Sequence, residues 1–155
     1  MKTKIIAMLA IVFLFLSVRA TRGDESAKRS KAKTSKTSAA VLAELTKNLE
    51  YDFAKQSVRD AYFKKLDLLA KAVIDDNYAV SLKGHADGIG PYKYNWVLSD
   101  KRAVSVKDYL VSKGVKESRI VTTPFGSTVP IASNKTASGR QKNRRVEIDL
   151  KKITE

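Results

Sequence analysis

The segment KGHADGIGPYKYNWVLSDKRA, residues 83–103, is the most informative part of the sequence about the fold, because its pattern predicts a change from a strand to a helix. Ahead of it, Tyr78, Val80 and Leu82 alternate with other residues, which is the pattern of a half-buried strand. Three glycines and a proline follow and predict a loop at the end of that strand. Apolar residues then recur at helical spacing, which predicts a helix from about residue 95 to residue 113.

The chain ahead of this segment predicts another strand and another helix. Leu49, Tyr51 and Phe53 alternate with polar residues and predict a short strand. Five apolar residues then follow at spacings of four, four, three and four, which places them on one face of a helix that ends near residues 75–77. They are Val58, Tyr62, Leu66, Leu69 and Val73.

The chain after this segment predicts two further strands. Gly114 is suited to end the preceding helix in a left-handed turn. Residues 119–126, RIVTTPFG, predict a third strand, and residues 144–150, RRVEIDL, predict a fourth with strict alternation. Residues 137–143 between them are polar or form a short helix. This order predicts an α/β (α+β) two-layer sandwich, β-α-β-α-β-(α)-β, in which helices pack on a mixed four-stranded sheet and the first two strands are parallel.

Composition divides the chain into three predicted parts. Residues 1–20 predict a signal peptide, because two lysines precede an apolar run that is too short to cross a bilayer. Residues 21–40 are rich in Lys, Arg, Ser and Thr and contain no large apolar side chain, which predicts a basic flexible linker. Residues 41–155 form the predicted folded domain. An uncleaved membrane anchor is the alternative for residues 1–20, and in either case we expect this domain to leave the cytoplasm.

The charge balance favours an anionic partner. The chain has 30 Lys and Arg residues against 16 Asp and Glu residues, a formal net charge of +14. The predicted signal peptide would take the chain out of the cytoplasm, so anionic wall polymers or lipid headgroups are better candidates than nucleic acid. The chain has no cysteine and so offers no disulfide, thiolate nucleophile or cysteine-linked lipid. Any association with a membrane is therefore expected to be indirect or non-covalent.

His85 and Asp87 are the residues that most resemble a catalytic pair. On an extended chain, residues two positions apart point the same way, as a general base and its orienting carboxylate would. No serine near them lies in a nucleophile motif, so we predict no enzyme and no cofactor, and expect a neighbouring backbone group to satisfy His85. One histidine and no cysteine leave too few ligands for zinc, so we predict no metal site.

Asp87 and Arg102 place one anion at the end of a predicted strand and one cation near the start of the next helix. Such a pair suits a zwitterion, since Arg binds a carboxylate bidentately and Asp accepts from an ammonium group. Backbone N–H groups of Gly88, Ile89 and Gly90 are expected to complete the cradle. Spacing alone favours the simpler alternative, a structural salt bridge between Asp87 and Arg102.

Three motifs resemble the OmpA-like peptidoglycan-binding family, which includes the C-terminal domain of OmpA, the peptidoglycan-associated lipoprotein and MotB. The family's G-H-(T/A)-D element resembles residues 84–87, its N-x-x-L-S-x-x-R-A element residues 95–103, and its N-R-R-V-E element residues 143–147. The resemblance covers roughly residues 49–150, with the motifs in the family's order. It implies a β-α-β-α-β-α-β fold, which agrees with the elements expected from periodicity.

The resemblance implies roles for further residues. Asp87 and Arg102 would hold the diaminopimelate head of a peptidoglycan stem peptide. Asn95 would brace the loop, and Asn143 with Arg144 or Arg145 would border the groove. Simpler alternatives stay open, because Asn95 also suits a helix cap and adjacent residues of a strand face opposite sides.

We therefore expect a non-catalytic, non-covalent binder of peptidoglycan that links the cell envelope to the wall. The expected location is the periplasm, in association with the outer membrane or the cell wall. One alternative is an electrostatic binder of anionic polymers or lipid that has no stereospecific site. Others are a structural subunit that contacts further envelope proteins, and a wall-cleaving hydrolase that uses His85 and Asp87.

Overall fold

A computed structural model describes residues 39–154 of the 155-residue chain. The predicted signal peptide and most of the predicted linker lie outside the described residues, so these parts and the boundary at residue 41 stay predictions. Residues 39–45 are helical and precede the first strand. Within the described part, no helix is both long and apolar enough to span a bilayer.

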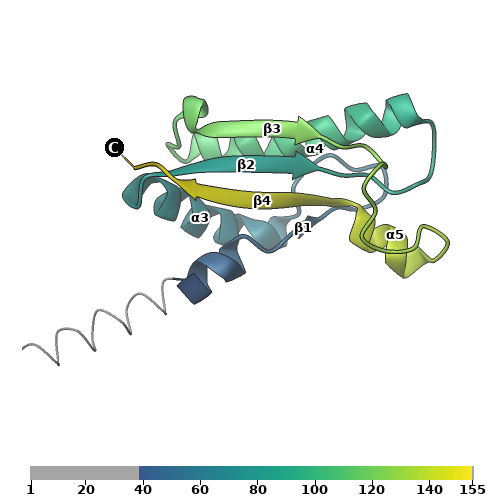
Figure 1. Ribbon diagram of the computed structural model, residues 1–155, viewed down its shortest axis with the longest axis horizontal. Coiled ribbons are helices and arrows are strands. Elements are labelled where there is room, and N and C mark those ends of the chain that lie inside the picture. Colours follow the sequence, from purple (N-terminus) through teal and green to yellow (C-terminus); the bar gives the residue numbers. More distant parts are fainter. Residues whose placement is uncertain (1–38, 155) are drawn as a thin grey trace, which may run out of the picture. The chain divides into compact units, whose positions relative to one another are not determined.

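Four strands form one mixed sheet in the order β1-β4-β2-β3 (Figure 1). β2 pairs in parallel with β3 and antiparallel with β4, and β4 also pairs antiparallel with β1. The end of β2 therefore lies between two strands, with Gly84 opposite Val146 of β4 and Pro124 of β3. The strands are β1 Leu49–Glu50, β2 Tyr78–Gly84, β3 Ile120–Pro124 and β4 Arg145–Lys152.

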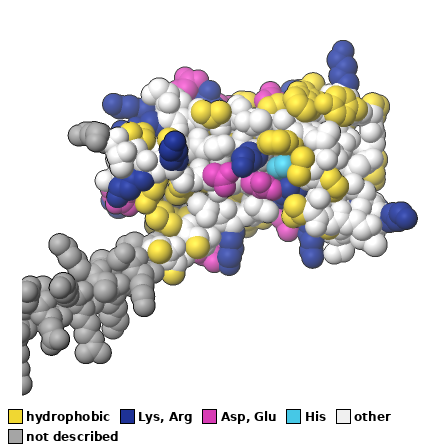
Figure 2. Space-filling view, viewed as in Figure 1, with side chains coloured by type: hydrophobic (Ala, Val, Ile, Leu, Met, Phe, Trp, Pro, Cys, Tyr) yellow, Lys and Arg dark blue, Asp and Glu magenta, His cyan; other side chains and the backbone are white. Residues whose placement is uncertain are grey.

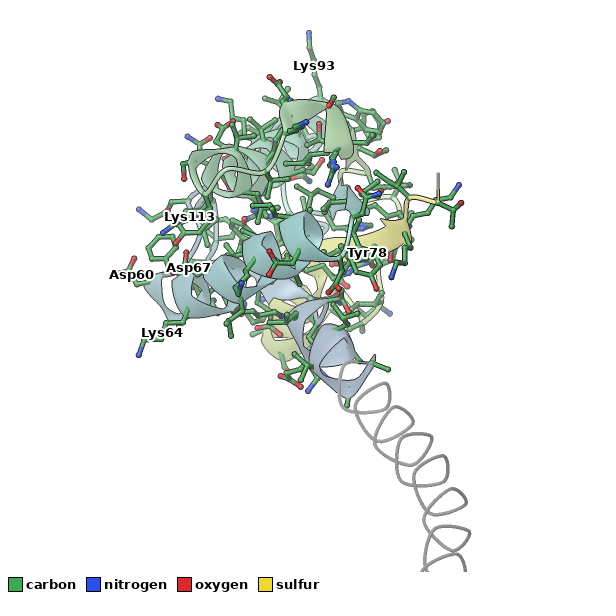
Figure 3. All side chains as sticks on the ribbon, turned by 90° about the vertical axis from the view of Figure 1, so that its left-hand side faces the viewer. Asp60, Lys64, Asp67, Tyr78, Lys93 and Lys113 are labelled. Atoms are coloured by element: carbon green, nitrogen blue, oxygen red, sulfur yellow. The ribbon has the colours of Figure 1, made fainter. Side chains whose placement is uncertain are left out.

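Two long helices cover one face of this sheet, which confirms the expected two-layer α+β architecture (Figure 1). An ion pair of 2.8 Å between Asp67 and Lys113 links α3 to the end of α4, and Figure 3 shows the two side chains next to each other. Gly114 follows with φ of 94°, the left-handed conformation expected at this helix end. The helical segments are η1 Asp60–Tyr62, α3 Phe63–Asp75, α4 Tyr92–Ser112, η2 Glu117–Arg119 and α5 Ala137–Asn143.

The core lies between the helices and the sheet. The apolar residues at helical spacing in α3 and α4 pack against the alternating apolar residues of β2 and β4, so both periodicities point into one core. The fully buried members include Leu66, Leu69, Val73, Val106, Leu110, Leu82 and Val146.

Two expectations need correction. The strand predicted through Phe53 ends at Glu50: the chain turns away, Ala54 adopts φ of 56°, and the Phe53 side chain is 59% exposed. α4 begins at Tyr92 rather than near residue 95, because Pro91 precedes its first turn with an extended conformation that is compatible with a helix start. The first two strands run in the same direction, as expected, with β4 between them and paired with both.

Candidate functional site

The end of β2 and the middle of α4 approach each other closely, and Gly84 makes this possible. A Cβ atom at this position would lie 1.9 Å from the carbonyl oxygen of Ser99. Two further hydrogen bonds tie in the loop after β3: Gly126 N–H donates to Ser99 Oγ (2.9 Å), and Ala86 N–H donates to the Gly126 carbonyl (2.8 Å). The chain after Gly84 therefore leaves the sheet along a fixed path beside α4.

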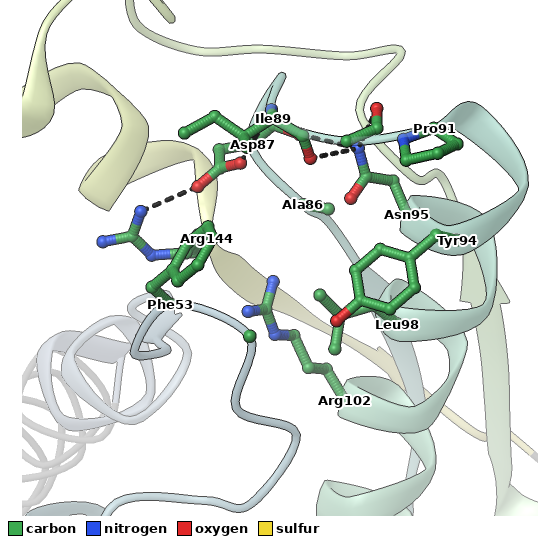
Figure 4. Close-up of a pocket in the computed structure, with 12 residues that line it drawn as sticks. Phe53, Ala86, Asp87, Ile89, Pro91, Tyr94, Asn95, Leu98, Arg102 and Arg144 are labelled. Atoms are coloured by element: carbon green, nitrogen blue, oxygen red, sulfur yellow. Dashed lines mark hydrogen bonds and ion pairs between the residues drawn. The ribbon is translucent and has the colours of Figure 1, made fainter.

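A pocket of about 260 Å³ lies between this chain, α4 and the loop after β1 (Figure 4). Three charged residues contribute to its lining, namely Asp87, Arg102 and Arg144. Most of the remaining lining is apolar and includes Phe53, Ala86, Ile89, Tyr94 and Leu98. In Figure 4 the side chains of Phe53 and Tyr94 lie on opposite sides of the pocket. The pocket therefore combines a few fixed charges with apolar walls, as ligand sites commonly do.

Arg102 is fully buried, and its guanidinium is held by neutral oxygen atoms. Its Nη1 and Nη2 donate to the carbonyls of His85 (2.9 Å) and Asp52 (3.1 Å), and its Nε donates to the carbonyl of Lys55 (2.9 Å). The guanidinium also lies 5.2 Å from the centre of the Tyr51 ring. Among the described residues no carboxylate forms a salt bridge with Arg102. Burial lowers the pKa of Arg102 to about 10, so the side chain stays charged at neutral pH.

Asp87 forms its ion pair with Arg144 rather than with Arg102. Arg144 Nη1 donates to Asp87 Oδ2 at 2.7 Å, and the backbone N–H of Ile89 donates to Asp87 Oδ1 at 3.0 Å. Arg144 follows α5 directly, and its Nε donates to the carbonyl of Tyr51 (3.1 Å). The structural salt bridge between Asp87 and Arg102 that spacing alone favours is therefore wrong, because Arg144 occupies that role.

Asn95 holds the loop from inside. Its amide Nδ2 lies within hydrogen-bonding distance of the carbonyls of Asp87 (3.2 Å), Ile89 (3.0 Å) and Gly90 (3.4 Å). Because Asn95 is 2% exposed and lies in the first turns of α4, the helix fixes the loop conformation. Gly90 has φ of 92°, a conformation that favours glycine at this bend. The side chain of Asn95 therefore does not cap the helix, which is the simpler alternative.

The expected cradle of loop N–H groups is only partly available. Gly88 N–H donates to Asn134 Oδ1 (2.9 Å), and Ile89 N–H donates to the Asp87 carboxylate. Both groups therefore stabilise the loop itself in this structure. Ile89 and Gly90 line the pocket, whereas Gly88 faces Asn134 outside it.

Of the first three residues of the chain's last motif, the structure places one at the pocket. Arg144 lines it, but Asn143 is fully buried and holds the segment before α5, accepting from the N–H groups of Ile131 (2.9 Å) and Ala132 (3.0 Å). Arg145 is 1% exposed and bonds Glu147 on the other side of β4. Asn143 at the end of α5 therefore does not border the groove as expected. Of the two arginines it is Arg144 that does, because successive residues where β4 begins face opposite ways.

His85 and Asp87 do not act as a pair in this geometry. The His85 ring is buried, stacks on Phe125 with ring centres 5.1 Å apart, and lies 3.6 Å from Glu147. Neither of its ring nitrogens has a hydrogen-bond partner among the described residues, so the expected backbone partner is not found there. Burial and the nearby Arg145 cation lower the pKa of His85 to about 4. Figure 2 shows the histidine among charged side chains on the sheet face that the helices leave uncovered.

The part of the chain that the structure describes contains no cluster of three or more His, Cys, Asp or Glu side chains that could hold a metal ion. The apolar walls of the pocket were not expected from the sequence. Tyr94 and Leu98 are one helical turn apart on α4, a spacing that could have identified them. Phe53 lies after the turn that ends β1, and no local pattern indicates its position.

Comparison with known proteins places these observations in a family. Residues 50–144 match the OmpA family. The chain is 46% identical over 101 residues to outer membrane protein A of Bordetella avium, covering 64% of this chain and 52% of that protein. It is 40% identical over 96 residues to the peptidoglycan-associated lipoprotein of Buchnera aphidicola, covering 61% and 56%. The chain thus spans about half the length of these curated relatives.

A solved structure shows the same fold. The peptidoglycan-associated lipoprotein of Burkholderia pseudomallei superposes with a TM-score of 0.65 at 26% identity, covering 67% of this chain and 89% of that one. These matches confirm the resemblance that the three motifs indicate, and they confirm the fold class.

Proposed function

The chain belongs to the OmpA family, and on that premise we propose that its folded domain binds peptidoglycan without covalent chemistry, through the diaminopimelate head of a stem peptide. Arg102 carries the proposal. It is a fully buried cation at the wall of an open pocket, and no carboxylate of the described residues neutralises it. Such a charge is costly in free energy unless a ligand supplies the anion. The name of the Buchnera relative, which refers to peptidoglycan, gives the ligand class.

The head group fits the pocket's chemistry at both ends. Its carboxylate would accept from the guanidinium N–H groups of Arg102 that the three backbone carbonyls leave unused. Its ammonium would donate to the Asp87 carboxylate, which has acceptor positions beyond those taken by Arg144 and Ile89. The aliphatic chain of the ligand would pack between Phe53 and Tyr94.

Binding of this kind would retain the protein at the wall. Hydrogen bonds to charged groups contribute about 1.5–3 kcal/mol each, so a single stem peptide is bound with modest affinity. A polymer that presents many stems raises retention by rebinding. We propose a location in the periplasm beside the wall, which accords with the names of the relatives.

Sedimentation with purified peptidoglycan tests this function. The wild-type protein should pellet at low and at moderate salt, whereas Arg102→Ala should stay in solution and Asp87→Ala should be retained more weakly. Asp149→Ala is the matched control, because Asp149 is an exposed aspartate whose ion pair with Lys83 (2.6 Å) lies on β2 and β4, away from the pocket lining. Equal pelleting of all four proteins would refute the proposal.

The net charge of +14 favours a second candidate, an electrostatic binder without a stereospecific site. Retention by charge alone should fall steeply as salt rises and should not respond to the stereochemistry of the pocket. Wild-type protein that leaves the pellet at moderate salt, together with unchanged behaviour of Asp87→Ala at low salt, would favour this candidate.

A further inference from the structure

The pocket treats the two charges of a zwitterionic ligand unequally. Resting on the proposed function, we propose that the carboxylate of the head group is the dominant determinant of binding and that its ammonium group is a minor one. The reason is that Asp87 already has a counter-charge within the pocket, whereas Arg102 has none among the described residues.

At the Arg102 end, the ligand would supply the missing anion. The three hydrogen bonds of Arg102 go to neutral carbonyls, and its guanidinium lies beside the ring of Tyr51. The charges of Arg144 and Asp87 also act on Arg102, with opposite signs, but neither forms a salt bridge with it. Neutral carbonyls satisfy N–H donors but do not cancel a full positive charge. A ligand carboxylate that reaches this guanidinium would therefore form an ion pair in a buried setting, where such pairs are screened least.

At the Asp87 end, the counter-charge is already present. The Asp87 side chain is 5% exposed and pairs with Arg144 at 2.7 Å, and the Arg144 side chain is 12% exposed. A ligand ammonium would share a carboxylate that Arg144 has already neutralised. Its gain is smaller, because it adds a second cation next to the first.

The sum of the lining charges has the same consequence. Asp87 contributes one negative charge, and Arg102 and Arg144 contribute two positive charges, among the residues that line the pocket. A ligand with a carboxylate and no amine would neutralise this excess, whereas a ligand with an amine and no carboxylate would increase it. Because the Arg102 guanidinium is buried, solvent screens this difference less there than it would at an exposed site.

Two analogues of the diaminopimelate stem peptide each lack one of the two head-group charges and add no atoms. Replacing diaminopimelate by lysine in a stem peptide removes the carboxylate and keeps the amine. Replacing it by 2-aminopimelate removes the amine and keeps the carboxylate. A third peptide, with the free carboxylate converted to its amide, keeps the shape and removes the charge.

Calorimetric titration of the protein with these four peptides tests the inference. The lysine and amide peptides should bind about tenfold to a hundredfold more weakly than the diaminopimelate peptide, and the aminopimelate peptide less than about fivefold more weakly. Equal losses for the lysine and aminopimelate peptides, or a larger loss for aminopimelate, would overturn the inference while the proposed function stands. Failure of the diaminopimelate peptide itself to bind would overturn both.

A variant sharpens the same test from the protein side. Arg144→Gln removes the charge that neutralises Asp87, so the ammonium should matter more and the loss on deleting the amine should rise to about tenfold. An unchanged loss in a folded Arg144→Gln protein would contradict the role assigned to Arg144. If this variant does not fold, the comparison of peptides on the wild-type protein still decides the inference.

Discussion

Arg102 and Arg145 are both fully buried arginines, yet their surroundings differ in the one respect that matters for function. Arg145 lies at the start of β4 and donates through Nε to Glu147 Oε1 at 2.8 Å, so its charge is neutralised within the chain. Arg102 lies on α4 and donates only to backbone carbonyls among the described residues. Burial alone therefore does not distinguish the two arginines, and the binding role that we propose for Arg102 rests on its lack of a counter-charge within the described part of the chain, beside an open pocket.

The largest expected effect that separates the two arginines is on stability. Arg145→Ala leaves Glu147 without its partner and removes the donor to the Val129 carbonyl (3.3 Å), so the free energy of unfolding should fall by about 2–3 kcal/mol. Urea denaturation measures this change. The folded fraction should bind peptidoglycan as the wild type does, and a selective loss of binding without a loss of stability would contradict the structural role of Arg145.

The next effect concerns pH on the Arg145 side of the sheet. The pKa of His85 is lowered to about 4, so the unfolded chain takes up a proton near pH 6.5 while the folded chain does not. Stability should therefore be complete above about pH 6.5 and fall as the pH drops toward 4, by at most about 1.4 kcal/mol per pH unit.

His85→Phe tests this pH dependence, because it keeps a ring next to Phe125 and removes the titrating group. The groups that face the ring are Arg145, Glu147 and Lys83. Stability curves for wild type and variant that stay parallel between pH 4 and 6.5 would show that His85 does not contribute.

A smaller effect is expected on the Asp87 side of the pocket. Asp87→Asn keeps an oxygen that can accept from the N–H of Ile89 but loses the charge that pairs with Arg144. Affinity for a diaminopimelate stem peptide should fall about threefold to tenfold, less than for changes at Arg102. Fluorescence anisotropy with a labelled peptide measures it, and complete loss of binding by a folded Asp87→Asn protein would reverse the ranking of the two residues.

The sequence predicts those parts of the fold in which periodic burial dominates. Leu66, Leu69 and Val73 form the buried face of α3, and Val146 and Ile148 form that of β4, because each element buries one side against the same core. The strand expected through Phe53 fails for a local reason: the alternation continues to Phe53, although the strand ends at Glu50 and the chain turns at Ala54.

The sequence predicts that Asp87 and Arg102 lie near each other, but it predicts neither the ion-pair partner of Asp87 nor the apolar walls of the pocket. Asp87 and Arg102 belong to motifs that resemble those of a known family, yet the partner of Asp87 is Arg144, 57 positions away. Nothing in the sequence near Arg144 and Arg145 says which of them meets the pocket. That choice depends on the start of β4, where one side chain faces the loop and the next faces Glu147.

The most direct test of the binding role proposed for Arg102 is to measure the affinity of one soluble diaminopimelate stem peptide for three proteins: the wild type, Arg102→Gln and Arg145→Gln. Thermal melting establishes the folded fraction of each protein. Gln removes the charge and keeps a side-chain donor at both positions. Because the ligand carboxylate would pair with Arg102, Arg102→Gln should lose at least about tenfold in affinity, whereas Arg145→Gln should stay within about twofold of wild type. Equal losses at the two positions, or a larger loss at Arg145, would contradict it.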